Sequence, residues 1–278
     1  MRRLLISAII TLTFSYSASG FKDQVCKIYS ESMKKDIPVS VITPKDYDQN
    51  KEFPTVYLLH GYSGNHRDWV ESDGVKEMAD QYGLIIVAPD GGFDSWYIDS
   101  KFVPDYQYET FISSELISYI DKHFKTIKNR SARAITGLSM GGHGALHTAI
   151  KHQDIFGIVG STSGGVDIRP FPDKWNIAAR LGSYSEYPEN WENSTVINMI
   201  HLIKPDSLKI IIDCGTEDFF YEVNCNLHKK LLAEGIPHDF YSRPGKHNWP
   251  YWCNSIKYQM LFFHECFTAD IFAEMDNR

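Results

Sequence analysis

Five short apolar runs, spread along the chain, restrict the fold more than any other feature of the sequence. The runs cover residues 55–60, 84–88, 131–138, 155–160 and 208–213. They are rich in β-branched residues and show no polar alternation, which is typical of strands buried on both faces of a mainly parallel sheet. Three further strands are expected at residues 25–30, 37–43 and 239–243, the first two joined by a polar turn at residues 33–36.

Helical patterns lie between the runs, at residues 69–82, 106–124, 142–151, 222–234 and 252–267. Alternation of strands and helices predicts an α/β fold with a mostly parallel central sheet flanked by helices and right-handed crossovers. Residues 163–205 break the alternation, because they carry Pro, Trp and Tyr with only short helical pieces such as 175–181. We interpret them as a small insertion over the active site, within a single domain at residues 21–278.

The N-terminus has the three parts of a secretory signal peptide. Arg2 and Arg3 precede an apolar run at residues 4–14, and small residues follow at 17–20. The run is shorter than the roughly 20 residues that span a bilayer, so residues 1–20 are expected to be cleaved and no membrane span to remain. We therefore expect a secreted or periplasmic protein. The net charge of −7 and the absence of a basic run argue against nucleic acid as a partner.

The five cysteines do not decide between free thiols and disulfides. An exported protein can form disulfides, but an odd count leaves at least one cysteine unpaired. No pair has the spacing of a zinc site, and no metal is expected. The cysteines are Cys26, Cys214, Cys225, Cys253 and Cys266. Neither their pairing nor the oligomeric state follows from the sequence.

A Gly-x-Ser-x-Gly motif gives the first candidate for chemistry. Residues 137–141 read Gly-Leu-Ser-Met-Gly, between the strand expected at 131–138 and the helix expected at 142–151. This setting is that of a nucleophile elbow, a tight turn that presents a serine between strand and helix. Ser139 is therefore the predicted nucleophile.

A nucleophilic serine needs a base and an acid that orients the base. When the serine lies on a nucleophile elbow, the acid follows it along the chain and the histidine follows the acid. His247 lies in a loop after the last strand, where an imidazole can reach over the sheet. Other histidines further along the chain lie within predicted helices or next to strands; they are His201, His228, His238 and His264. We predict His247 as the base.

The acid is expected at the end of the strand at residues 208–213. Asp213 lies on the strand itself, where a structural hydrogen bond or helix cap is a reasonable role. Glu217 and Asp218 both reach the loop that follows. Asp218 is the preferred acid, with Glu217 as the alternative.

An oxyanion hole requires backbone amides directed at the developing negative charge. One is expected from Met140, directly after the nucleophile. A second is expected from Tyr62, in the glycine-containing loop after the strand at residues 55–60. His60, which begins that loop, is interpreted as a structural hydrogen-bonding residue.

Four segments together resemble the esterase D-like family of α/β-hydrolases: residues 58–69, 137–142, 213–218 and 245–249. That family includes S-formylglutathione hydrolases, mycolyltransferases, and feruloyl and acetyl esterases of plant-cell-wall enzymes. The resemblance implies the α/β-hydrolase fold, an acid at Asp218, and oxyanion amides at Tyr62 and Met140. Residues 93–100 resemble a segment that borders the active site in secreted bacterial carbohydrate esterases. Trp96 and Trp249 are accordingly candidates for substrate binding, although aromatic residues there could equally belong to the core.

The expected function is that of a secreted serine carboxylesterase that works through an acyl-enzyme and needs no cofactor. Feruloyl or acetyl esters of plant polysaccharides are the expected substrates. Two alternatives remain open: acyl transfer to a sugar or lipid alcohol, and a non-catalytic carbohydrate-binding protein on the same fold.

Overall fold

The computed structural model describes residues 21–276 except 48 and 49, so the predicted signal peptide lies outside the described residues. Eight strands form one sheet in the order β1-β2-β4-β3-β5-β6-β7-β8. Their bounds are β1 (Lys22–Ser30), β2 (Lys35–Thr43), β3 (Thr55–Leu59), β4 (Ile85–Pro89), β5 (Arg133–Gly137), β6 (Ile158–Thr162), β7 (Lys209–Gly215) and β8 (Asp239–Arg243). The last strand has the predicted limits, and the others differ by a few residues at their ends.

Strand direction places the loops that matter for function. β1 and β2 form an antiparallel hairpin, and β2 pairs antiparallel with β4. All pairs from β4 to β8 are parallel. Their carboxyl ends therefore meet at one edge of the sheet, where open α/β sheets bind ligands.

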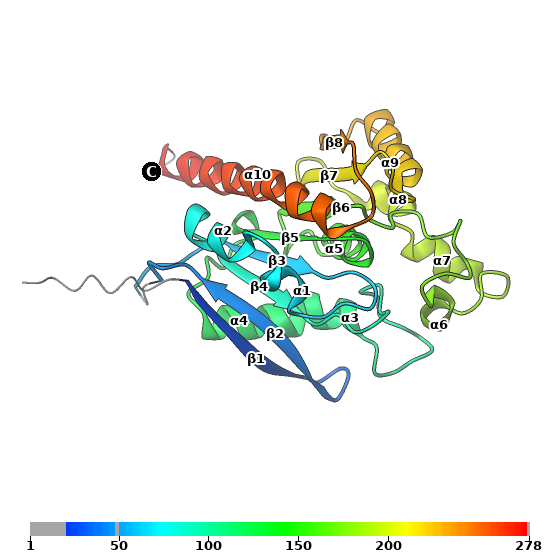
Figure 1. Cartoon of the computed structure of the whole chain (residues 1–278), viewed down its shortest axis with the longest axis horizontal. Coiled ribbons are helices and arrows are strands. Elements are labelled where there is room, and N and C mark those ends of the chain that lie inside the picture. The colour runs from blue at the N-terminus through cyan, green and yellow to red at the C-terminus, as the bar shows by residue number, and fades with distance from the viewer. Residues whose placement is uncertain (1–20, 48–49, 277–278) are drawn as a thin grey trace, which may run out of the picture.

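The central strand β3 is buried on both faces, which explains its unbroken apolar sequence. Tyr57 and Leu59 point into one core, and Val56 and Leu58 point into the other. Helices α1 (Asp68–Glu71), α2 (Val75–Tyr82) and α10 (Trp249–Asp276) cover the Val56 face. The Tyr57 face is covered by α3 (Tyr108–Thr110), η1 (Phe111–Leu116), α4 (Ile117–His123), α5 (Met140–Lys151) and α9 (Tyr221–Ala233). Figure 1 shows α10 and α4 on opposite sides of the sheet.

Two predicted helices differ in detail from the observed ones. The helix predicted at residues 69–82 is two helices, because Ser72, with a ψ of 153°, ends α1 in an extended conformation, and Gly74, with a φ of 82°, precedes α2. The helix predicted at 106–124 begins at Tyr108 and contains the π-helical turn η1 between α3 and α4. Among the described helices, none is long and apolar enough to cross a membrane.

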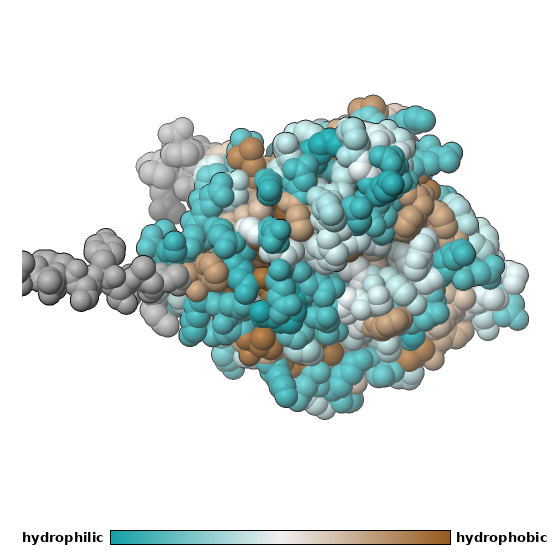
Figure 2. All heavy atoms as spheres, in the orientation of Figure 1, coloured by the Kyte–Doolittle hydropathy of each residue, from teal (hydrophilic) through white to brown (hydrophobic). Residues whose placement is uncertain are grey.

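The segment at residues 163–205 is an insertion with four short helical pieces, as predicted. They are α6 (Ile177–Leu181), α7 (Pro188–Ser194), α8 (Val196–Met199) and the 3₁₀ turn η3 (Ile200–Leu202). In Figure 1, α6 and α7 project beyond one end of the sheet. On the face that Figure 2 shows, hydrophobic residues form small scattered groups among hydrophilic ones.

Candidate active site

The turn from β5 into α5 places Ser139 in an unusual backbone conformation. Its φ is 56° and its ψ is −117°, which a non-glycine residue rarely adopts. Two glycines allow the close packing around it. A Cβ atom on Gly137 would lie 2.5 Å from the carbonyl oxygen of Leu59, and one on Gly141 would lie 2.3 Å from the same atom. The motif therefore forms the strand–turn–helix expected from the sequence.

Three predicted residues come together from distant loops. The Oγ of Ser139 lies 2.9 Å from Nε2 of His247, and Nδ1 of His247 lies 2.8 Å from Oδ2 of Asp218. An ionised carboxylate can only accept hydrogen bonds, so Nδ1 carries the proton and donates to Asp218. Nε2 of the neutral ring is then an acceptor, and the Ser139 hydroxyl donates to it. This arrangement can move the hydroxyl proton onto the imidazole.

The carboxylate in contact with His247 is that of Asp218 and not that of either neighbouring acid. The Asp218 side chain is fully buried, and its Oδ1 also accepts a 2.8 Å hydrogen bond from the Phe220 amide. Glu217 is exposed and forms an ion pair with Lys246. Asp213 is buried on β7, where it accepts from the Tyr251 hydroxyl and pairs with Arg243. Asp213 thus has the structural role that its strand position suggested.

Two backbone amides are candidates for an oxyanion hole. The Met140 amide is at the first residue of α5, where the helix dipole favours negative charge. Tyr62 lines the cavity that contains Ser139. Neither amide has a hydrogen-bond acceptor among the described residues. The neighbouring Ser63 amide donates to the carbonyl of Phe93 at 2.7 Å, which fixes the loop that carries Tyr62.

His60 is a structural residue, as interpreted from the sequence. Its Nε2 accepts a 2.7 Å hydrogen bond from the Gly91 amide, so the proton of the neutral ring lies on Nδ1. Nδ1 donates to the carbonyl of Gly61 at 2.7 Å. Burial lowers the pKa of His60, which keeps the ring neutral and able to accept from Gly91. The imidazole therefore holds the start of the Tyr62 loop against the segment after β4.

A cavity of about 550 Å³ opens above Ser139 and His247. Aromatic side chains dominate its wall: Tyr62, Trp175, Phe219, Trp249 and Trp252. Trp249 lies where the resemblance to carbohydrate esterases placed it. Trp96 does not line this cavity; it is 1% exposed, and its indole packs behind Trp175. Its burial is the physical reason to remove it from the substrate-contacting residues.

Sequence reasoning missed three residues of this wall: Trp175, Phe219 and Trp252. Phe219 could have been inferred because it follows Asp218 directly. Trp252 could have been inferred because it lies one helical turn beyond Asn248. Trp175 could not, because it belongs to the insertion. The Phe219 ring lies 4.2 Å and the Trp252 ring 5.0 Å from the His247 ring, so both pack against the imidazole.

Within the described part of the chain, no group of three or more His, Cys, Asp or Glu side chains is arranged to hold a metal ion. Cys26, Cys214, Cys225 and Cys253 form no disulfide with one another in the described part of the chain.

The fold and the geometry of the site define an α/β-hydrolase of the serine hydrolase class. The family model described as "Putative esterase" matches residues 30–263, and the chain belongs to this esterase family. The family and fold inferred from the sequence motifs are thereby confirmed.

Relatives with known names carry esterase activities. The chain is 28% identical over 246 residues to an "Acetyl esterase" of Caldicellulosiruptor saccharolyticus, covering 81% of this chain and 91% of the relative. It is 30% identical over 237 residues to "Esterase Rv1288" of Mycobacterium tuberculosis, covering 75% of this chain but only 52% of that longer protein. Among solved structures, a "ferulic acid esterase" superposes with a TM-score of 0.77 at 28% identity, over 89% of this chain and 99% of that one.

Proposed function

We propose that this chain is a serine carboxylesterase that releases hydroxycinnamoyl groups, such as feruloyl, from carbohydrate esters. The observation that carries the catalytic part is the continuous hydrogen-bonded chain from Asp218 through His247 to Ser139. The aromatic wall supports the acyl group, because planar rings bind favourably against Tyr, Trp and Phe side chains. A cavity of about 550 Å³ also exceeds what an acetyl group requires.

In the proposed reaction His247 accepts the Ser139 proton while Oγ attacks the ester carbonyl. The amides of Met140 and Tyr62 stabilise the oxyanion. The tetrahedral intermediate collapses, the C–O bond to the alcohol breaks, and protonated His247 gives its proton to the departing alcohol oxygen. Water, deprotonated by neutral His247, then attacks the acyl-enzyme and releases the acid. Asp218 orients the imidazole and stabilises its charged form.

The first test replaces the nucleophile. Ser139→Ala is expected to lower kcat for p-nitrophenyl acetate and methyl ferulate by about 10⁴-fold or more, since the attacking atom is lost. Ser161→Ala is a matched control: this buried serine lies on the neighbouring strand β6, and its Oγ has no hydrogen-bond partner. It should turn over both esters normally. Normal turnover by Ser139→Ala would overturn the proposal.

We further propose that residues 1–20 are a cleaved signal peptide and that the enzyme acts in the periplasm or outside the cell. The charged start and short apolar run support this proposal. N-terminal sequencing of the protein recovered from the culture medium or periplasm would test it. A mature chain that begins near residue 21 is the expected result, and an intact Met1 in the cytoplasmic fraction would contradict it.

A further inference from the structure

We propose that Trp175 selects aromatic acyl groups at the active site, and that Trp96 and Asp94 are positioning residues that hold Trp175 there. This inference rests on the proposed esterase function and deepens it. It concerns two segments. One is the insertion, which contributes Trp175 to the cavity wall, and the other is the buried segment at residues 93–100, which the sequence had predicted to border the substrate.

Trp175 is part of an aromatic stack that reaches the catalytic imidazole. Its ring is nearly parallel to that of Phe219, with centroids 5.4 Å apart and an interplanar angle of 21°. Phe219 in turn lies 4.2 Å from the His247 ring. Trp175 and Phe219 both line the cavity above Ser139. A planar acyl group bound to Ser139 would therefore have this stack as one side of its pocket.

The backbone of Trp175 would not hold this position by itself. Trp175 and Asn176 both have left-handed conformations, with φ values of 49° and 53°. Asparagine tolerates this region, whereas a bulky residue such as tryptophan disfavours it. Trp96 and Tyr97 form a second left-handed pair, with φ values of 54° and 56°. Contacts with the rest of the protein must stabilise both turns.

The two left-handed turns are fastened to each other. The Trp96 indole N–H donates to the carbonyl oxygen of Trp175 at 3.1 Å. Beside it, the side-chain amide of Asn176 donates to Oδ2 of Asp94 at 3.0 Å. Arg180 of α6 forms an ion pair with the same carboxylate at 3.1 Å. The bonds thus hold the backbone directly after the Trp175 side chain.

Trp96 and Asp94 act through Trp175 because they are shielded from any substrate. Trp96 is 1% exposed and Asp94 4% exposed, and neither lines the active-site cavity. The Trp96 indole N–H and the Asp94 carboxylate bond to residues 175, 176 and 180 and not to Ser139 or His247. We therefore expect replacement of either side chain to change mainly the position of the Trp175 ring.

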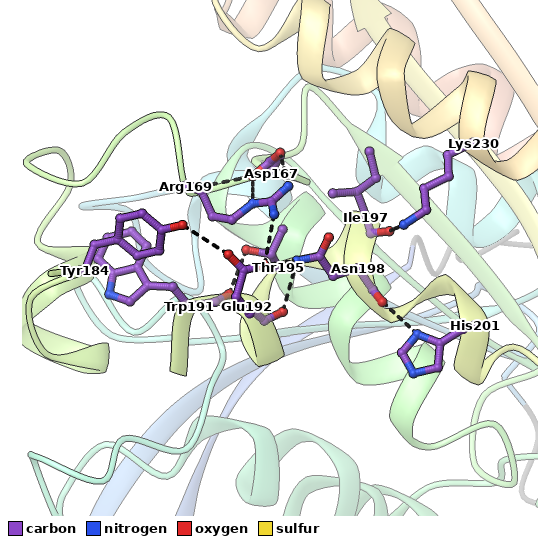
Figure 3. Close-up of polar contacts among 10 residues, drawn as sticks. All are labelled: Asp167, Arg169, Tyr184, Trp191, Glu192, Thr195, Ile197, Asn198, His201 and Lys230. Carbon is purple, nitrogen blue, oxygen red and sulfur yellow. Dashed lines mark hydrogen bonds and ion pairs between the residues drawn. The ribbon is translucent and has the colours of Figure 1, made fainter. Parts of the chain in front are cut away.

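Other hydrogen bonds and ion pairs hold the rest of the insertion in place. Figure 3 shows Arg169 between Asp167 and Glu192, with Tyr184 and Asn198 also bonded to Glu192. Lys230 of α9 donates to the carbonyl of Ile197 at 2.7 Å. These contacts hold α7 and α8, so the loss of the Trp96 bond should loosen the segment around Trp175 and not the whole insertion.

The experiment compares a bulky aromatic ester with a small one. We would measure kcat and KM with methyl ferulate and methyl acetate, which differ only in the acyl group, for Trp175→Ala, Trp96→Phe and Asp94→Asn. Each variant is expected to lower kcat/KM for methyl ferulate by about tenfold or more, mainly through a higher KM, because the aromatic contact is misplaced or lost. For Trp96→Phe and Asp94→Asn the effect on methyl acetate should stay below about threefold, because neither residue lines the active-site cavity.

Trp191→Phe is the matched control for Trp96→Phe. Trp191 is also fully buried in the insertion, and its indole N–H donates to the carbonyl of Gly182 at 2.9 Å. It should lose the same kind of bond without a change in the ratio of the two kcat/KM values. Equal losses for both esters in Trp96→Phe, or the same shift of the ratio in Trp191→Phe, would overturn the positioning role. An unchanged KM for methyl ferulate in Trp175→Ala would overturn the selecting role. Failure of the proposed function would look different, because the unmodified protein would then hydrolyse neither ester.

Discussion

At the residue scale, Gly141 is the position with least freedom around the nucleophile. A Cβ atom here would meet the carbonyl oxygens of Leu59 and His60 at 2.3 and 2.6 Å, and backbone atoms cannot turn away as a side chain can. Gly141→Ala must therefore push the start of α5 away from β3 and displace Ser139. We expect kcat for both esters to fall about 100-fold or more, and the free energy of unfolding to fall by about 1–3 kcal/mol. Steady-state kinetics and urea unfolding would measure the two effects.

Gly83→Ala is the control for Gly141→Ala, because it replaces a glycine of positive φ without creating a steric clash. Gly83 has a φ of 60°, and a Cβ atom there would have no neighbour within 4 Å. The left-handed conformation should cost about 1 kcal/mol of stability, while turnover stays normal. Normal turnover by Gly141→Ala as well would show that the elbow tolerates a wider turn than its geometry indicates.

At the element scale, the insertion depends on charged contacts more than on helix length. Arg169 lies 2.8 Å from Asp167 and 2.9 Å from Glu192, and these bonds raise the pKa of the guanidinium. Arg169→Met keeps most of the apolar stem but leaves both carboxylates without this partner. We expect a loss of about 1–2 kcal/mol, which for a chain of this size lowers Tm by roughly 2–8 °C. Thermal unfolding in low salt would measure it.

An exposed pair provides the comparison for Arg169. Lys34 and Glu31 lie 3.0 Å apart, but their side chains are 71% and 76% exposed. Lys34→Met should change Tm little, because water screens such pairs. Similar shifts in the two variants would mean that the network around Arg169 adds nothing beyond an ordinary surface pair.

Elements were predictable from the sequence where their pattern was set locally. The buried strand β3 follows directly from residue type, since apolar β-branched runs have few alternatives in an α/β chain. The break between α1 and α2 was missed because the pattern of apolar residues continues across it, although Ser72 is extended and Gly74 has a positive φ. The spacing of apolar residues along the sequence shows which side chains are buried, but it does not show whether the helical backbone is continuous.

At the scale of the whole molecule, the site was predictable to the extent that chain order fixes it. Ser139, Asp218 and His247 each follow a different strand of one parallel sheet, so the carboxyl-end rule brings them to one edge. Trp175 obeys no such rule. Its backbone is bonded to Trp96, and the neighbouring Asn176 is bonded to Asp94, both about 80 residues earlier in the chain. The presence of Trp175 in the cavity wall, where Trp96 had been predicted, therefore depends on tertiary contacts.

Stability of the whole molecule should fall in acid because α5 buries a histidine beside a carboxylate. Burial lowers the pKa of His147 from 6.5 to about 3. Burial alone would raise the pKa of Glu109, but the bond to His152 and the groups of His147 and Lys151 outweigh it and bring it from 4.5 to about 2. In both cases the unfolded chain binds a proton that the folded protein does not. The resulting stability is complete above pH 6.5, declines from there toward pH 3 through His147, and declines further from pH 4.5 toward pH 2 through Glu109.

Urea unfolding between pH 7 and pH 5 can isolate the histidine contribution. Burial also lowers the pKa of His60 and His143, so the wild-type slope contains more than one residue. One histidine that stays neutral only in the folded protein adds up to about 1.4 kcal/mol per pH unit. His147→Gln should reduce the slope by up to this amount, because glutamine fills similar space without titrating. An unchanged slope in His147→Gln would mean that His147, which stacks on His143 within α5, is accessible to protons in the folded state.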